Sequence, residues 1–289
     1  MKPAICGALD LHLAAHDTRY DRETAKVTKK AAVGAAAFAF SDPHVYTVRM
    51  KTFSLFRAFV VSTVLAATAL AANTAIEPVA RDAKWIKRHD QFVAQATRGG
   101  IDLLFLGDSI TDAWRTKGSN VWAKYYAPRN AANFGISADR TQHVLWRMAN
   151  GELDGLKPKV VVLLIGTNNT GNEKDTGKPR NTPPEAIEGV TAVVKRLRAK
   201  LPGSRILLLA IFPRGEKDSP QRDQIKQINS AIAQLADGKQ VKFLDLGKGF
   251  LEPDGTLPKD VMPDLLHPNE KGYQIWAEAM ESTLADMLK

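Results

Sequence analysis

The stretch IDLLFLGDSITDAW (Ile101–Trp114) is an apolar run that ends abruptly in Gly107-Asp108-Ser109. A short, continuously apolar run of this kind is typical of a strand that is buried on both faces of a parallel sheet. The acid and the hydroxyl at its tip have two interpretations. They can cap a helix by accepting free backbone N–H groups, or Ser109 can be a nucleophile. The tripeptide alone does not decide between them, so the decision depends on the rest of the chain.

Further apolar runs follow the first one, and helical patterns lie between them. The clearest helix is predicted over 182–203, where Thr182 and Glu185 fit a capping box and an apolar stripe follows. The alternation of strands and helices predicts a single three-layer α/β domain over residues 73–289. We expect strands at 101–106, 131–136, 160–165, 205–212 and 241–246, and further helices at 83–97, 138–149, 221–236 and 270–288.

The first 72 residues differ from the rest of the chain. From Met50, a short basic segment leads into an apolar run at 58–72 that ends in small residues. This order predicts a secretory signal peptide over 50–72, and the run is shorter than the roughly 20 residues of a membrane-spanning helix. A buried helix is the alternative. Because a secretory signal begins at the true N-terminus, we expect residues 1–49 to be a mis-called, disordered upstream extension. The mature protein is then periplasmic or secreted, with no stable membrane span.

Charge and cysteine content exclude several classes of function. The net charge is +9, but no basic run or basic–aromatic ladder accompanies it, so nucleic-acid binding has little support. Cys6 is the one cysteine, which excludes a disulfide framework and a cysteine-based metal site. The three histidines after residue 73 show no clustered ligand spacing, so no zinc site is expected. The phosphate-binding Gly-x4-Gly-Lys-Ser/Thr spacing and the Gly-x-Ser-x-Gly elbow are both absent.

Polar residues stand beyond or near the ends of four expected strands. Ser109 follows the first strand, Gly135 lies close to the end of the second, Asn168 follows the third, and Asp264 and His267 come after the fifth. Ligands bind at this edge of a parallel sheet. Acyl transfer needs a serine nucleophile, a histidine base, an acid that orients the base, and hydrogen-bond donors for the developing oxyanion. These five residues can supply all of those parts.

The choice of base rests on the other histidines. His89 and His143 fall inside helical patterns, where a structural role is expected, whereas His267 lies in a turn three residues after Asp264. The alternative is that this turn merely caps the last helix, for which Asn269 is the better candidate. We expect Asp108 to hold its turn by hydrogen bonds. The long polar loop at 167–181 is expected to be functional or simply solvated.

Four sequence blocks follow one another at the expected strand ends: GDSIT (107–111), FGISADRT (134–141), GTNN (166–169) and DLLH (264–267). In this order they resemble the SGNH (GDSL) hydrolase family, and the resemblance covers nearly all of residues 80–289. It is greatest to the platelet-activating-factor acetylhydrolase alpha-subunit type and its bacterial acetylhydrolase relatives, on the basis of residues 138–148, 211–215, 250–257 and 264–273.

The resemblance implies a role for each candidate residue. Ser109 would be the nucleophile and an oxyanion donor through its N–H, and Gly135 and Asn168 would be the other donors. His267 would be the base and Asp264 its partner. The implied fold is a flavodoxin-like sheet of five parallel strands in the order 2-1-3-4-5, with helices on both faces, and no cofactor is implied.

We therefore expect a serine esterase that removes short acyl groups, acetyl above all, from O-acetylated carbohydrates or small esters. A lipid esterase or lysophospholipase-type enzyme is one alternative, although no apolar insertion that could line a long groove lies beside the four blocks. The other alternative is a non-catalytic glycan-binding protein on the same scaffold, because function resides in the site and not in the fold.

Overall fold

The computed structural model describes residues 72–289 except residue 174. The predicted signal peptide and upstream extension lie outside these residues, so the division of the chain at residues 50 and 73 stays a prediction. Within the described residues, none of the helices has the length and apolar character that crossing a bilayer requires.

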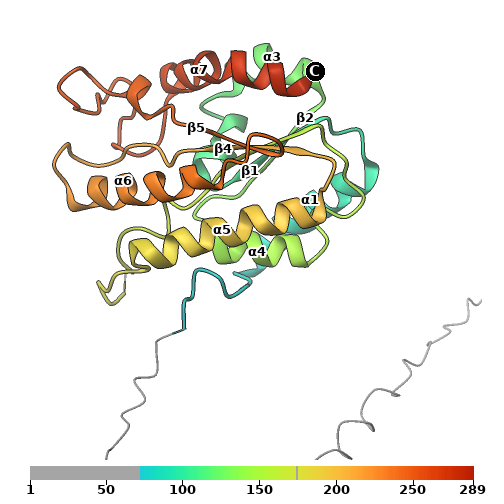
Figure 1. Cartoon of the computed structure of the whole chain (residues 1–289), viewed down its shortest axis with the longest axis horizontal. Coiled ribbons are helices and arrows are strands. Elements are labelled where there is room, and N and C mark those ends of the chain that lie inside the picture. Colours follow the sequence, from blue (N-terminus) through green and yellow to red (C-terminus); the bar gives the residue numbers. More distant parts are fainter. Residues whose placement is uncertain (1–71, 174) are drawn as a thin grey trace, which may run out of the picture. The chain divides into compact units, whose positions relative to one another are not determined.

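Five parallel strands form one central sheet (Figure 1). Their order is β2-β1-β3-β4-β5, which confirms the predicted order. Gly107, at the end of β1, pairs with Gly135 on one side and Leu164 on the other, so these three strand ends share one edge. The strands are β1 (Leu103–Gly107), β2 (Ala131–Gly135), β3 (Val160–Leu164), β4 (Arg205–Leu209) and β5 (Val241–Leu244).

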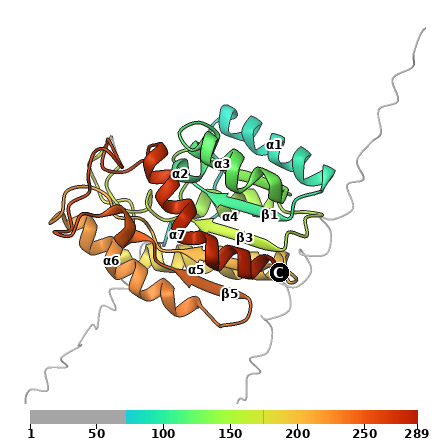
Figure 2. The same cartoon turned by 90° about the horizontal axis from the view of Figure 1, so that it is seen from above.

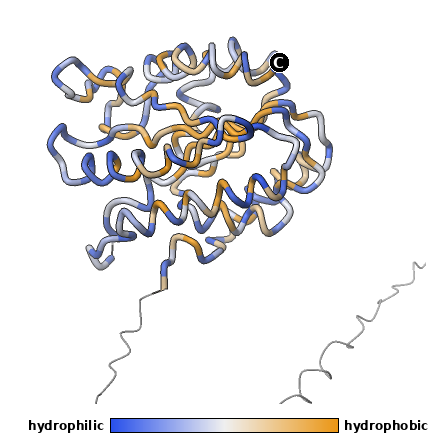
Figure 3. Tube along the Cα trace, viewed as in Figure 1, coloured by the Kyte–Doolittle hydropathy of each residue, from blue (hydrophilic) through white to orange (hydrophobic). Residues whose placement is uncertain are grey.

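Helices cover both faces of the sheet, as Figures 1 and 2 show. On one face, α1, α4, α5 and α6 enclose a core with the inward side chains of the strands. On the other face, α3 and α7 pack over a second, aromatic-rich core. Figure 3 shows the hydrophobic residues concentrated in the sheet between these layers. The longer helices are α1 (Ala83–Arg98), α3 (Ser119–Tyr125), α4 (Thr141–Ala149), α5 (Pro183–Lys200), α6 (Pro220–Ile232) and α7 (Glu270–Leu288).

Helix boundaries follow local capping. The predicted capping box of α5 is present, since Glu185 Oε2 accepts the N–H of Thr182 at 2.7 Å. Asn269 caps α7 by accepting the N–H of Gly272 at 3.1 Å, also as predicted. Short 3₁₀ turns complete the fold at Ala113–Arg115, Ala127–Arg129, Ala233–Leu235 and Gly247–Phe250.

Several details differ from the sequence-based expectation. The strands at 205–212 and 241–246 end earlier, at Leu209 and Leu244, and the helix expected from 138 begins at Thr141. The helices α2 (Ser109–Asp112) and α3 were not predicted. Helix α3 has no apolar stripe that the sequence could show, because Val121 is its one buried residue.

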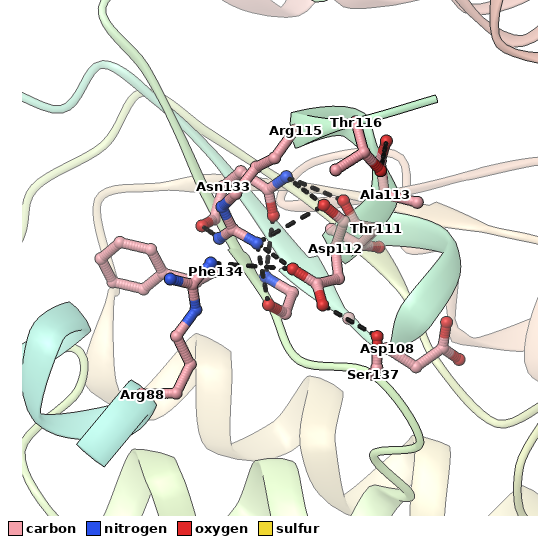
Figure 4. Close-up of polar contacts among 12 residues, drawn as sticks. Arg88, Asp108, Thr111, Asp112, Ala113, Arg115, Thr116, Asn133, Phe134 and Ser137 are labelled. Carbon is pink, nitrogen blue, oxygen red and sulfur yellow. Dashed lines mark hydrogen bonds and ion pairs between the residues drawn. The ribbon is translucent and has the colours of Figure 1, made fainter. Parts of the chain in front are cut away.

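The outer edge of strand β2 is covered by an arginine (Figure 4). Arg115 donates hydrogen bonds to the backbone oxygens of Asn133 and Gly135 and to the carboxylate of Asp112. Exposed strand edges can pair with other chains, and a charged side chain placed along an edge prevents this. The same contacts tie β2 to α2, which carries the predicted nucleophile.

Candidate active site

Ser109 is the first residue of α2 and stands directly beyond the end of β1. Asp108 caps this helix, since its Oδ1 accepts the N–H of Ile110 at 3.0 Å. Asp108 thus holds the turn, as predicted, and the Ser109 hydroxyl is left for another partner. The N–H of Ser109 makes no hydrogen bond to any other described residue.

His267 and Asp264 share one turn before α7, and this turn reaches Ser109. His267 Nε2 lies 2.9 Å from Ser109 Oγ. On the other side of the ring, His267 Nδ1 lies 2.6 Å from Asp264 Oδ2. The structure therefore brings these three predicted residues together in one chain of hydrogen bonds.

The Asp264 carboxylate is held by its own turn. Its Oδ1 accepts the backbone N–H groups of Leu266 at 3.1 Å and His267 at 2.7 Å. Partial burial raises the pKa of Asp264, but the hydrogen bonds from His267 outweigh burial and hold that pKa below its usual value. The turn also contains Leu265 at a φ of 57°, a strained conformation of the kind that gathers at functional sites.

Asn168 lies just beyond β3, and its amide faces the loop at 137–139. Its Nδ2 donates a hydrogen bond to the backbone oxygen of Asp139 at 3.0 Å. An amide nitrogen carries two hydrogens. The second one has no acceptor among the described residues, so it remains available to a substrate.

The structure corrects the prediction for Gly135. Its N–H already donates to the side-chain Oδ1 of Asn133 at 2.9 Å, so it is not a free donor. A Cβ added at Gly135 would lie 2.3 Å from the backbone nitrogen of Asp112. Glycine is therefore required at this position because β2 packs directly against the backbone of α2.

Ala138 offers a free backbone N–H that the sequence analysis did not single out. It has a φ of 65°, its side chain is exposed, and its N–H makes no hydrogen bond within the described residues. It precedes Asp139, whose backbone oxygen is bonded to Asn168. The free N–H of Ala138 thus lies on the loop that the Asn168 amide contacts. An alanine between Ser137 and Asp139 gives no sign of a left-handed backbone, whereas a glycine there would have suggested one.

We expect opposite changes in stability from substituting Ala138 and from substituting Gly135. Ala138→Gly removes the strain of a left-handed alanine and should raise the free energy of unfolding by about 0.5–1 kcal/mol. Gly135→Ala forces a Cβ into the backbone of α2 and should lower it by about 2–3 kcal/mol. Urea unfolding of both variants checks this, and a stabilised Gly135→Ala variant would contradict the packing described above.

The other two histidines after residue 73 have structural partners. His89 Nε2 lies 3.0 Å from the backbone oxygen of Asn150, and His143 Nδ1 accepts the N–H of Arg140 at 3.0 Å. Burial lowers the pKa of both, that of His143 to about 3. Both rings pack within the helical layer, in agreement with the structural role predicted for them.

Comparison with known proteins identifies the family. A model described as the GDSL-like lipase/acylhydrolase family matches residues 105–275, more than half of the chain. The chain belongs to the GDSL-like lipase/acylhydrolase family. Human platelet-activating factor acetylhydrolase IB subunit alpha1 is 35% identical over 216 residues, which cover 74% of this chain and 89% of that protein. The resemblance drawn from the four sequence blocks is confirmed, and the protein is a hydrolase of ester bonds.

Solved structures share the fold of this acylhydrolase. A GDSL-like lipase from Bacteroides thetaiotaomicron matches with a TM-score of 0.55 and 17% identity, covering 68% of this chain and 97% of that one. An acetylxylan esterase from Geobacillus stearothermophilus matches with a TM-score of 0.52 and 23% identity, covering 65% and 94%.

A buried ion network lies behind the site of this acylhydrolase. Arg147 is fully buried, with its Nε 3.0 Å from Asp139 Oδ2 and its Nη1 2.6 Å from Glu152 Oε1. Arg147 also donates to the backbone oxygens of Phe134 at 2.8 Å and Gly107 at 3.4 Å. One guanidinium therefore connects the ends of β1 and β2 to the loop at 137–139.

The loop at 137–139 is also held from the N-terminal side. Arg81 Nη1 donates to the backbone oxygen of Ser137 at 2.7 Å and to Asp139 Oδ1 at 3.1 Å. Trp85 Nε1 donates to the same carboxylate oxygen at 2.7 Å. Burial raises the pKa of Asp139, and the arginines and Trp85 oppose that change. The loop with the free Ala138 N–H is thus fixed before substrate arrives.

Proposed function

We propose that the protein is a serine esterase for short acyl groups, acetyl above all, with Ser109 as nucleophile, His267 as base and Asp264 as the partner of the base. The observation that carries this proposal is the continuous chain from Ser109 Oγ to His267 Nε2 (2.9 Å) and from His267 Nδ1 to Asp264 Oδ2 (2.6 Å). Such an arrangement activates a hydroxyl that is otherwise a weak nucleophile.

The proposed reaction proceeds through an acyl-enzyme. Ser109 Oγ attacks the ester carbonyl carbon while its proton passes to His267 Nε2, and the carbonyl electron pair moves to the oxygen. The tetrahedral intermediate then expels the alcohol, which takes the proton from His267. Water repeats the sequence on the acyl-enzyme and releases the acid and Ser109. Asp264 keeps Nδ1–H oriented and stabilises the positive ring throughout.

We infer that the oxyanion is bound by the N–H of Ser109, the N–H of Ala138 and the amide of Asn168. All three have a hydrogen that is not used elsewhere in the described part of the chain. Preorganised donors of this kind each contribute about 3–4 kcal/mol to transition-state stabilisation. The buried contacts of Arg147 and Asp139 support this geometry because they fix the loop that carries Ala138.

A short acyl group on a carbohydrate or small alcohol is the preferred substrate in this proposal. The names of the relatives, an acetylhydrolase and an acetylxylan esterase, both describe removal of acetyl groups. Beside Asn168, the wall of the site is made by Arg180 and Arg214, which donate to the backbone oxygens of Asn168 and Thr167 at 3.1 Å each. Guanidinium groups in this wall favour a small polar substrate over a long acyl chain.

Acyl-chain length tests this proposal. With p-nitrophenyl acetate, butyrate and octanoate, we expect kcat/KM to fall at least about tenfold from two to eight carbons, because the guanidinium groups of Arg180 and Arg214 beside Asn168 do not favour added methylenes. A fluorophosphonate probe should label Ser109 in the same preparation. A profile that peaks at eight carbons would indicate a lipid esterase, and absence of both turnover and labelling would indicate a binding protein.

We also propose that the protein is exported, with a signal peptide over 50–72. The motivation is the basic start, apolar run and small-residue end from Met50 onward. N-terminal sequencing of the native protein tests this: a terminus near Asn73 supports it, and a stable product that keeps residues 1–49 contradicts it.

A further inference from the structure

A polar cavity of about 580 Å³ adjoins the candidate active site. Its walls come from the loop after β3, from Arg214 beyond β4, and from the start of α6. These walls touch the backbone of the site, since Arg180 bonds the oxygen of Asn168 and the N–H of Gly215 bonds the oxygen of Leu265 at 2.7 Å. The cavity therefore lies next to the backbone of Asn168 and next to the turn that carries Asp264 and His267.

Two guanidinium groups line the cavity, and each shares its nearest carboxylates with other groups. Burial lowers the pKa of both Arg180 and Arg214, which shows that their charges are partly desolvated. The carboxylate of Glu173 pairs with Arg140 through two hydrogen bonds of 2.6 and 2.8 Å and reaches Arg180 only at 3.6 Å. Partly buried charges in proteins are normally paired.

The carboxylates near Arg214 also interact with other groups. Asp108 is fully buried, which raises its pKa to about 7, and its Oδ1 accepts the N–H of Ile110 at 3.0 Å. Asp264 is bonded to His267. Arg214 itself uses only its Nη1 for hydrogen bonds to described residues, both to Thr167. The remaining donors of its guanidinium are free for a ligand.

Unused polar atoms lie in the same walls. The hydroxyl of Ser219 is enclosed and has no hydrogen-bond partner in the described residues, and the enclosed Nε of Arg180 has only its 3.6 Å contact with Glu173. Buried polar atoms are nearly always satisfied, and the exceptions call for an explanation such as a bound ligand. Gln221 and Gln224 add side-chain amides, which suit hydroxyl groups.

We propose that this cavity binds an anionic oxygen group of the substrate, a carboxylate or a phosphate, so that the preferred esters are acidic, such as an O-acetylated uronic acid or sugar phosphate. Arginine is suited to this task because its planar group of donors matches both anions. The inference rests on the proposed esterase function, since it names the substrate class of the same site.

The test compares acetylated sugars that carry an acidic group with an acetylated neutral sugar. Acetylated methyl glucuronide, methyl glucoside and glucose 6-phosphate are assayed with p-nitrophenyl acetate as the reference substrate. We expect kcat/KM for an acidic sugar to exceed that of the neutral sugar by about 10- to 100-fold, mainly through KM. Preference for the glucuronide assigns a carboxylate, and preference for the phosphate ester assigns a phosphate.

Substitutions in the cavity test whether it causes this preference for acidic substrates. Arg180→Gln and Arg214→Gln should each bring the acidic-to-neutral ratio down towards one, whereas Arg196→Gln, which removes the same charge from the exposed side of α5, should leave the ratio unchanged. A ratio near one in the parent protein, or one that persists in both cavity variants, overturns the inference.

A calorimetric titration separates the inference from the proposed function. If p-nitrophenyl acetate is hydrolysed but the ratio is one, only the inference fails. If no ester is hydrolysed, the proposed function fails, and binding of methyl glucuronide or inorganic phosphate, weakened by Arg214→Gln, still supports the anion site. Absence of binding to both probes overturns the site.

Discussion

Ser109→Ala is expected to lower kcat for p-nitrophenyl acetate by about 10⁶-fold, to the level left by oxyanion donors and substrate binding alone. The loss is this large because the Ser109 oxygen both forms the covalent bond and gives its proton to His267, 2.9 Å away. The fold should survive, since Asp108 and not Ser109 caps α2. Steady-state kinetics and a thermal melt of the purified variant check both statements.

Ser230→Ala is the matched control for this variant. Ser230 lies exposed on α6, and its hydroxyl donates to the backbone oxygen of Lys226. It should keep full activity. If Ser109→Ala retained half of the parental activity on any substrate, that result would contradict the proposed mechanism.

Arg147→Met is expected to cost about 3–5 kcal/mol of the free energy of unfolding. The substitution keeps much of the buried volume but leaves Glu152 without its positive partner and Asp139 with Arg81 alone, and both carboxylates are fully buried. The backbone oxygens of Phe134 and Gly107 also lose a donor. Urea unfolding of parent and variant measures the difference.

A surface arginine provides the comparison. Arg198 pairs with Asp237 at 3.1 Å with its side chain 45% exposed, so Arg198→Met should cost no more than about 1 kcal/mol. Adding Glu152→Gln to Arg147→Met should restore part of the lost stability by removing one unpaired buried charge. Equal losses in the two arginine variants would show that the buried network is not what holds the strand ends together.

Most of the sheet could be predicted because its strands are short apolar runs buried on both faces, and this pattern is readable without any partner. The serine, histidine and acid could be placed because each follows an expected strand or lies in a turn close to the sheet edge. Their contacts depend on how the loops fold, and only the structure brings His267 to Ser109.

The proposed oxyanion donors show where sequence reasoning stops. Gly135 was predicted to be an oxyanion donor because a glycine exposes its backbone N–H. In the structure, the missing side chain of Gly135 allows β2 to pack against α2. Ala138 supplies a free N–H through a backbone conformation that its residue type disfavours. Helix α3 was missed for a related reason, since it is recognised by what it packs against and not by its own pattern.

The turn that carries Asp264 and His267 has a consequence for how activity is controlled. Asp264 and His267 lie within four consecutive residues, and the Asp264 carboxylate accepts two of the turn's own N–H groups. The N–H of Gly215 donates to the oxygen of Leu265, and Leu265 and Leu266 pack against the core. A displacement of the turn would carry both residues away from Ser109 while leaving their mutual bond intact. Activity would then follow the docking of one loop rather than the separate assembly of three parts.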